Sequence, residues 1–264
     1  MNGINLETLT YQCLELVQSV GMYIKEQQTK VVNDDIIAKK QNSFVTFVDR
    51  EAEARLISRL QTLLPDATYI TEEDTVENIN SEISWIVDPL DGTTNFLYGI
   101  PIYSISLALK LEDKISIGIV HAIQQNESFF AWDKGGAFLN KKPIKISKRT
   151  RLIDAVVGTG FPYDKKKRVE EPYRIMKELL GNVRGIRRLG SAAMDLAYVA
   201  CGRLDAYYET NLNAWDVAAG GKIVEEAGGK VADFEDTTDW IWGKSILAAN
   251  PELHKTLLDI IRCV

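Results

Sequence analysis

The sequence predicts an α/β fold arranged in layers, and two patterns indicate this class. Between residues 103 and 133, apolar runs alternate with short polar turns, as in an antiparallel sheet. After about residue 150, short apolar runs alternate with stretches of helical periodicity, as in strands and helices that pack in separate layers. We therefore expect an N-terminal α+β subdomain over residues 1–150 and a C-terminal α/β subdomain over 151–264, packed together as one compact domain.

The N-terminal part should begin with two amphipathic helices. Apolar residues at helical spacing predict helices over 5–27 and 49–64, and Pro65 marks the end of the second. Strands are expected over 68–70 and 84–88, the latter buried and ending in an aspartate. The sheet that follows should contain strands over 105–111, 115–120 and 128–132 and a hairpin within 137–147.

The C-terminal part should alternate strands with helices. Strands are expected over 155–160, 182–188, 204–209, 230–234 and 245–250, and helices over 168–180, 191–201, 215–227 and 251–262.

Composition argues against several function classes. The chain has 264 residues, of which 45% are hydrophobic and 26% charged, so a sizeable core is possible. Its net charge is −6, whereas duplex nucleic acid or an anionic membrane calls for a basic face, and the only basic run is at 165–168. No leader pattern or apolar run of the ~18 residues needed to cross a membrane is present. We expect a cytoplasmic protein with neither a membrane nor a nucleic-acid partner.

Cysteine and histidine are too few and too scattered for a zinc site or a disulfide framework. Cys13, Cys201 and Cys263 lie far apart in the chain, no Cys-x-x-Cys occurs, and only His121 and His254 could add ligands. We expect reduced or buried thiols and structural or exposed histidines.

An acidic run after the strand at 84–88 carries the most chemical information. The strand delivers Asp88, Pro89 fixes the backbone, and Asp91 follows three residues later. Two carboxylates this close repel each other unless a cation neutralises them, and oxygen ligands without cysteine or histidine select Mg²⁺, Mn²⁺ or Ca²⁺. The following Gly92-Thr93-Thr94 suits a turn into a helix whose N–H groups hold phosphate oxygens. The alternative is that both aspartates only form a turn and a cap.

Three other acidic features complete the pattern. Asp49 lies in the second helix, and Glu72-Glu73 follows a strand, where neighbouring side chains point to opposite faces. One glutamate can therefore face a metal while the other supports it from behind. Asp216 opens a helix, where it is either a metal ligand or a simple N-terminal aspartate. Taken together, these residues indicate metal-assisted phosphoryl hydrolysis.

Other catalytic motifs are absent. The sequence contains neither G-x-S-x-G nor G-x-x-x-x-G-K-[ST]. Gly158-Thr159-Gly160 begins like a dinucleotide fingerprint, but the third glycine is missing and Pro162 interrupts it. We therefore do not expect a Rossmann dinucleotide-binding site.

At these residues the chain resembles the inositol monophosphatase family, within the lithium-sensitive, Mg²⁺-dependent phosphatase superfamily. WIVDPLDGTTNF (85–96) matches the first family signature, W-I-[IV]-D-P-[IL]-D-G-T-T-N-[FY], at every position, and WDVAAGGKIVEEAGG (215–229) matches the second. Glu72-Glu73 falls where the family has a Glu-Glu pair, and the likeness extends from residue 5 to about 262. It implies a layered α-β-α-β-α sandwich, a homodimer and inhibition by lithium.

The resemblance also implies roles for individual residues. Mg²⁺, for which Mn²⁺ can substitute, would be bound at two or three sites by Glu72, Asp88, Asp91, Asp216 and the Leu90 carbonyl. Asp49 would orient the hydroxyl of Thr93, which holds the attacking water, and Glu73 would support Glu72. Phosphate would lie at Asp91 and at the amides of Gly92 and Thr93. The alcohol would be bound by Glu209 and by the turn of Gly190, Ser191 and Ala192.

The mechanism that follows needs no phosphoenzyme. One metal, held by Glu72, Asp88 and Leu90, would lower the pKa of a water that Thr93 and Glu72 position and deprotonate. A second metal, held by Asp88, Asp91 and Asp216, would bind the phosphate and the leaving oxygen.

The substrate stays open among several esters. We expect a phosphomonoesterase for inositol monophosphate or a related sugar or polyol phosphate. The same chemistry on fructose 1,6-bisphosphate, the 2′-phosphate of NADP or 3′-phosphoadenosine 5′-phosphate is the alternative, and a second phosphate could contact Arg187 or Arg188. A non-catalytic module that binds metal or inositol phosphate is a further alternative. The chain departs from the family at Thr71, where glycine is usual, and at Ser43-Phe44-Val45-Thr46, in the family's mobile loop over 30–45.

Overall fold

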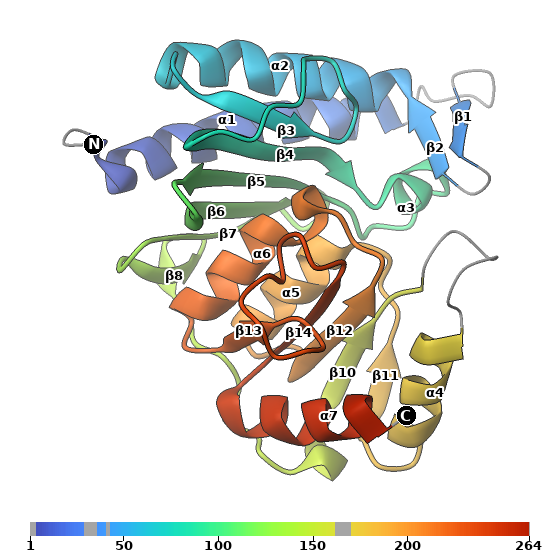
Figure 1. Ribbon diagram of the computed structural model, residues 1–264. Helices are drawn as coiled ribbons and strands as arrows, with labels where there is room; N and C mark the ends of the chain where they lie inside the picture. Colours follow the sequence, from blue (N-terminus) through green and yellow to red (C-terminus); the bar gives the residue numbers. More distant parts are fainter. Residues whose placement is uncertain (1–3, 29–35, 41–42, 162–169, 264) are drawn as a thin grey trace.

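Five layers build the protein, as the computed structural model shows for residues 4–28, 36–40, 43–161 and 170–263 (Figure 1). Two helices cover a seven-stranded sheet, two more lie between this sheet and a five-stranded one, and two cover the outer face of the second sheet. Three separate groups of buried apolar side chains fill the spaces between the layers. The α-β-α-β-α sandwich implied by the resemblance is confirmed.

The first two layers come from the N-terminal part of the chain. Helices α1 (Leu6–Gln27) and α2 (Phe47–Leu63) pack on the large sheet, as their apolar periodicity predicts. Its strands follow chain order, with β3 and β4 parallel and the other neighbours antiparallel. They are β3 (Thr68–Thr71), β4 (Ile83–Asp91), β5 (Ser104–Leu111), β6 (Lys114–Ala122), β7 (Glu127–Trp132), β8 (Gly136–Leu139) and β9 (Lys142–Pro143).

The remaining layers come from the C-terminal part. Helices α5 (Ala192–Ala200) and α6 (Ala214–Glu226) pack between the two sheets, while α4 (Glu170–Leu179) and α7 (Pro251–Cys263) cover the outer face. The second sheet has the order β11-β10-β12-β14-β13. Its strands are β10 (Val156–Thr159), β11 (Gly185–Arg187), β12 (Ala206–Thr210), β13 (Lys230–Ala232) and β14 (Ser245–Ala249), and a short 3-10 turn (Leu152–Asp154) precedes them.

Strand β4 differs from the prediction at its functional end. The expected strand ended at Asp88, but the observed one continues through Pro89 to Asp91. Opposite it on β5, Asp88 pairs with Ser106 and Asp91 with Ser104, so one extra residue on β4 forms a bulge. Proline has no N–H for a ladder bond, and a bulge tolerates this loss. The bulge redirects the chain between the two aspartates.

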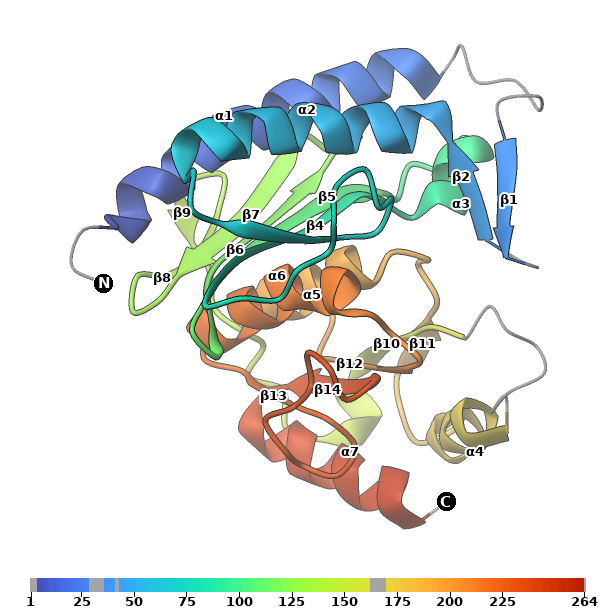
Figure 2. The ribbon, with the colours of Figure 1, turned by 45° about the horizontal axis from the view of Figure 1, so that its top comes forward.

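A small hairpin next to α2 was not predicted. Strands β1 (Ile36–Lys40) and β2 (Ser43–Thr46) pair antiparallel beside α3 (Thr93–Leu97), at one end of the large sheet (Figure 2). The rest of the 30–45 loop and the basic run at 165–168 lie outside the described residues. Helix α3 itself is the turn into a helix that the sequence predicts after Gly92.

No helix in the described parts of the chain is long and apolar enough to cross a membrane.

Candidate active site

The β4 bulge buries the first aspartate of the site. Asp88 is 1% exposed, and its Oδ1 accepts the backbone N–H of Leu90 at 2.9 Å. The carboxylate therefore fixes the backbone that follows it. The bulge and this short-range bond together set the direction of the chain toward Asp91.

Asp91 is held by the start of α5, a contact that the sequence did not predict. Its Oδ2 accepts the Ser191 hydroxyl at 2.6 Å and the Ala193 backbone N–H at 2.8 Å. A carboxylate is stabilised at a helix N-terminus by such N–H groups and by the helix dipole. Ser191, expected to line an alcohol pocket, therefore also orients Asp91 across the two halves of the chain.

Glycines bring the expected phosphate turn against the expected alcohol turn. Gly92 has a φ of 98°, and a Cβ there would lie 3.0 Å from the Ile102 carbonyl and 3.3 Å from the Gly190 carbonyl. Only glycine suits this left-handed backbone at such close approach. The neighbouring Thr93 donates its hydroxyl to the Leu90 carbonyl at 3.1 Å. The structure thus joins Gly92, Thr93, Leu90 and Gly190 in one place.

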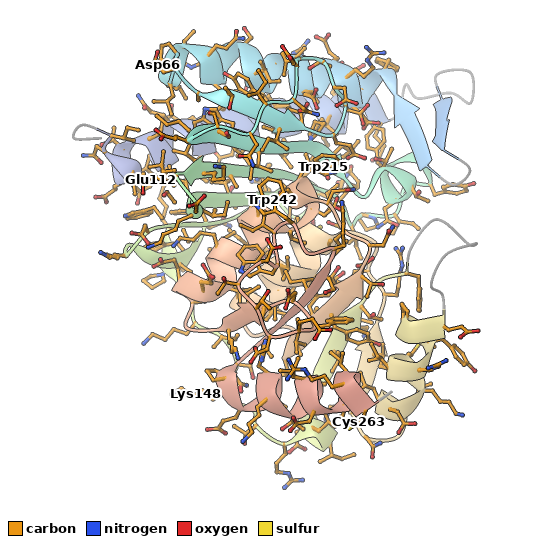
Figure 3. The ribbon with its side chains drawn as sticks, viewed as in Figure 1. Asp66, Glu112, Lys148, Trp215, Trp242 and Cys263 are labelled. Carbon is orange, nitrogen blue, oxygen red and sulfur yellow. The ribbon has the colours of Figure 1, made fainter. Side chains whose placement is uncertain are left out.

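Asp216 reaches the same region from the first turn of α6. Its Oδ2 accepts the backbone N–H of Asn213 at 2.6 Å, so it also caps its own helix. The Ser106 hydroxyl of β5 donates to the Trp215 carbonyl at 2.8 Å and ties this helix start to the large sheet. Figure 3 labels Trp215 at this point, beside the strands of that sheet.

Two further acidic segments are the loop that follows β3 and the first turn of helix α2. Glu72 follows β3, and its backbone N–H bonds to the Val87 carbonyl at 3.3 Å, next to Asp88. Asp49 lies buried in the first turn of α2, and Glu73 is 9% exposed behind Glu72. The predicted contact between Asp49 and Thr93 stays a prediction.

Electrostatic interactions indicate that the carboxyl groups of four residues lie in one region, and these are Glu72, Asp88, Asp91 and Asp216. Burial first, and then the charges of Glu72, Asp91 and Asp216, hold the pKa of Asp88 well above its ordinary value. Burial raises the pKa of Asp91 to about 6, and burial with repulsion from Asp91 raises that of Asp216 to about 8. As they stand, no three His, Cys, Asp or Glu side chains of the described residues converge closely enough to hold a metal ion. The ligand assignment therefore rests on this shared electrostatics and on the resemblance.

The residue expected to bind the alcohol, Glu209, lies on β12 against β10. Glu209 is half-buried on β12, and the fully buried Tyr207 donates its hydroxyl to Glu209 Oε2. Burial raises the pKa of Glu209 to about 7, while the Tyr207 bond and the Arg188 charge act to lower it. A Cβ on Gly160 would collide with the Glu209 carboxylate. The glycines of Gly158-Thr159-Gly160 therefore permit close packing of β10 against its neighbours.

Two charged residues act on Glu209 or lie near it, and of these Asp195 was not assigned from the sequence, whereas Arg188 was expected, with Arg187, as a possible contact for a second phosphate. Asp195 on α5 is 1% exposed, and burial followed by the charges of Glu209 and Asp91 holds its pKa well above its ordinary value. Arg188 acts on all three carboxyls, whereas Arg187 turns back and donates to its own strand at the Ile186 carbonyl, 2.9 Å away. The signal for Asp195 was a charged residue within an almost wholly apolar helix.

The fold and this acidic site together define a class: an α-β-α-β-α sandwich protein with a cluster of buried carboxyl groups. The family model described as "Inositol monophosphatase family" matches residues 5–264, so the chain belongs to the inositol monophosphatase family.

Relatives of two kinds are similar to this chain. The inositol-1-monophosphatase of Mesorhizobium japonicum is 36% identical over 250 residues, covering 94% of each chain. The Nus factor SuhB of Pasteurella multocida is 38% identical over 225 residues, covering 85% of this chain and 84% of its own. The crystal structure of the extragenic suppressor protein SuhB from Bartonella henselae aligns with a TM-score of 0.90 at 35% identity, covering 98% and 99% of the two chains.

Proposed function

We propose that the protein is a Mg²⁺-dependent phosphomonoesterase that hydrolyses inositol monophosphate or a related sugar or polyol phosphate. The observation that carries this proposal is the coupling of Asp88 to Glu72, Asp91 and Asp216, which come from three separate segments. Structural aspartates rarely gather in this way, because like charges that are buried together destabilise the fold.

The donor set fits a hard divalent cation. The groups that gather here are carboxylates and a backbone carbonyl, and neither of the two histidines is among the charges that act on Asp88. Oxygen donors of this kind suit Mg²⁺ or Mn²⁺. Glu72, Asp88, Asp91, Asp216 and the Leu90 carbonyl would hold the ions. Bound there, Mg²⁺ supplies a Lewis acid for the phosphate and lowers the pKa of water.

The chain's own residues supply orientation and proton transfer. Thr93, fixed through its hydroxyl to the Leu90 carbonyl, orients the attacking water, and Glu72 accepts its proton. By accepting the hydrogen bond from the Thr93 hydroxyl in place of the Leu90 carbonyl, Asp49 would orient that hydroxyl from α2, and Glu73 would support Glu72. The amides of Gly92 and Thr93 hold the phosphate oxygens.

Recognition of the alcohol falls to the C-terminal layer. Glu209 accepts hydrogen bonds from hydroxyls of a polyol or ribose, and Gly190 with Ala192 leaves room beside it. Arg188 lies close enough to lower the pKa of Glu209, which favours substrates with a second anionic group as the next candidates. These are fructose 1,6-bisphosphate, NADP and 3′-phosphoadenosine 5′-phosphate.

Phosphate release from this panel of esters with Mg²⁺ tests the proposal. We expect the wild-type protein to hydrolyse inositol 1-phosphate. If it hydrolyses none of the esters, the proposed activity is excluded. Glu209→Gln should lose turnover of inositol 1-phosphate and retain that of an aryl phosphate, which has no hydroxyls to bind. An equal loss on both would assign Glu209 to the chemistry or the fold.

Relatives named Nus factor raise a second role for the same fold. The net charge of −6 argues against direct binding of nucleic acid or of an anionic membrane, so we propose that the partner is the small phosphate ester alone. From the family resemblance we also propose a homodimer, and we propose that it is cytoplasmic. Filter binding with RNA at low salt tests the absence of a nucleic-acid partner, and retention of RNA by the protein would contradict it. Sedimentation tests the oligomeric state, and a monomer would contradict the homodimer.

A further inference from the structure

Helix α2 buries a glutamate that the proposed mechanism does not use. Glu53 is 0% exposed and lies four residues after Asp49, on the same face of α2. Burying a carboxylate is costly unless hydrogen bonds or a counter-charge stabilise it. Among the described residues, no lysine or arginine forms an ion pair with it.

Three donors from one short loop stabilise this carboxylate instead. Its Oε2 accepts the backbone N–H of Glu73 at 3.0 Å, and its Oε1 accepts the backbone N–H and the hydroxyl of Thr75 at 2.9 and 2.6 Å. Between these two residues, Asp74 has a φ of 51°, a left-handed conformation that aspartate adopts more readily than most non-glycine residues. Glu53 thus holds a tight turn in place.

The other side of Glu72 is fixed by a second polar side chain. Asn78 Oδ1 accepts the backbone N–H of Thr71 at 2.6 Å, and its Nδ2 donates to the Thr71 carbonyl at 3.0 Å and to Asp74 Oδ1 at 2.5 Å. Figure 2 shows the connection between β3 and β4 running beside α2. The backbone is therefore held at the residue before Glu72 by Asn78 and at the residue after it by Glu53.

We propose that Glu53 is a positioning residue that holds Glu72 opposite Asp88. The Glu72 carboxylate repels that of Asp88, so an unrestrained loop would move away from β4. The bonds to the backbone at Glu73 and Thr75 oppose this movement. The consequence for metal binding rests on the proposed function, whereas the clamp on the loop does not.

Glu53→Gln is the direct test, because it preserves size and replaces one acceptor oxygen by an NH₂ group. That group faces a backbone N–H, so at least one of the three bonds must break. Amide exchange at Glu73 and Thr75 should become about tenfold faster without metal. The dissociation constant of Mg²⁺, measured by calorimetry, should rise about tenfold, as for other groups that orient metal ligands. The KM of the phosphate ester should stay within about twofold.

Matched variants separate positioning from folding. Glu51→Gln changes an exposed glutamate of the same helix, which pairs with Arg55 at 2.9 Å, and should change neither quantity. Thr75→Val removes one hydroxyl that bonds to Glu53, and it should raise both the amide exchange rate and the dissociation constant of Mg²⁺ about threefold. This variant tests the proposal if Glu53→Gln does not fold.

Two results would overturn the proposal. One is unchanged amide exchange at Glu73 and Thr75 in the clamp variants, and the other is unchanged Mg²⁺ binding despite faster exchange. Calorimetry needs no turnover, so a wild-type protein that binds Mg²⁺ but hydrolyses no ester would contradict the proposed function and leave the clamp standing.

Discussion

Removing the hydroxyl that supports Glu209 should move the pH profile for a polyol substrate. Tyr207 is fully buried and donates to Glu209 Oε2, so Tyr207→Phe deletes one hydrogen bond without changing the packed ring. That bond favours the ionised form of Glu209, whose pKa burial raises to about 7. Loss of a hydrogen bond to a charged group costs about 1.5–3 kcal/mol, which corresponds to roughly one to two pH units.

The size of the effect follows from the ionised fraction. With a pKa of about 7, about half of the Glu209 side chains are ionised at pH 7, and a rise of one to two units leaves about a tenth or a hundredth. If the ionised form binds the polyol, kcat/KM for inositol 1-phosphate should fall about five- to fiftyfold at pH 7 and recover near pH 9. A cation at Asp91 would lower the pKa in both proteins, so the shift between them is the quantity to measure.

Profiles of kcat/KM from about pH 6 to pH 9.5 for inositol 1-phosphate and an aryl phosphate form the assay. The aryl ester lacks hydroxyls and serves as the control, with a profile that should not move. A loss that is equal for both esters, or that does not recover at high pH, would refute the link between Tyr207 and an ionised Glu209.

The remaining predictions concern the metal site and the fold. Asp91→Asn or Asp216→Asn should lower turnover by more than about tenfold (~1.4 kcal/mol in barrier) and leave the circular dichroism spectrum unchanged. Asp66→Asn changes an exposed aspartate and serves as the control, whose turnover should stay at the wild-type level. EDTA should abolish turnover and Mg²⁺ or Mn²⁺ restore it; full activity in chelator would exclude the mechanism. Lithium should inhibit relative to potassium at equal ionic strength, and unchanged rates would count against the family's metal arrangement. Burial lowers the pKa of His121 to about 4, so the unfolded chain binds more protons between about pH 6.5 and 4, and stability should fall by about 2–3 kcal/mol as the pH drops through this window. His121→Gln should reduce this loss in urea unfolding, and an identical loss in the variant would assign it to other groups.

Sequence patterns predicted the elements because most of them bury one regular face. The apolar positions of α1 repeat at helical spacing, and the buried run before Asp88 could only be a strand. The acid–proline–acid run also predicted a functional turn, but not that β4 continues through Pro89. A bulge depends on the partner strand, and the register between β4 and β5 cannot be read from one strand alone.

Residues that act across the fold were missed for a different reason. Glu53 looks like any surface glutamate of a helix, although it falls beside the apolar Ala52 and Leu56, and its three donors lie about twenty residues away. Tyr207 and Asp195 likewise read as core positions of β12 and α5. Their roles come from neighbours in space, which periodicity does not contain.

The residues proposed for the metal and those proposed for the alcohol come from different layers of the fold. The groups proposed for metal and water lie mostly on the large sheet and its helices, whereas those proposed for the alcohol lie on the C-terminal layers. Asn95 links the two, because its Nδ2 donates to the Ile102 carbonyl at 2.7 Å and to the Leu189 carbonyl at 2.9 Å, next to Gly190. Asp91 adds a second link, because its Oδ2 accepts the Ser191 hydroxyl and the Ala193 backbone N–H, so two side chains of the phosphate side hold the alcohol turn. Side chains such as Arg188 and Glu209 can differ between relatives without moving Asp88 or Thr93, which is a physical route by which one hydrolytic site can accept different phosphate esters.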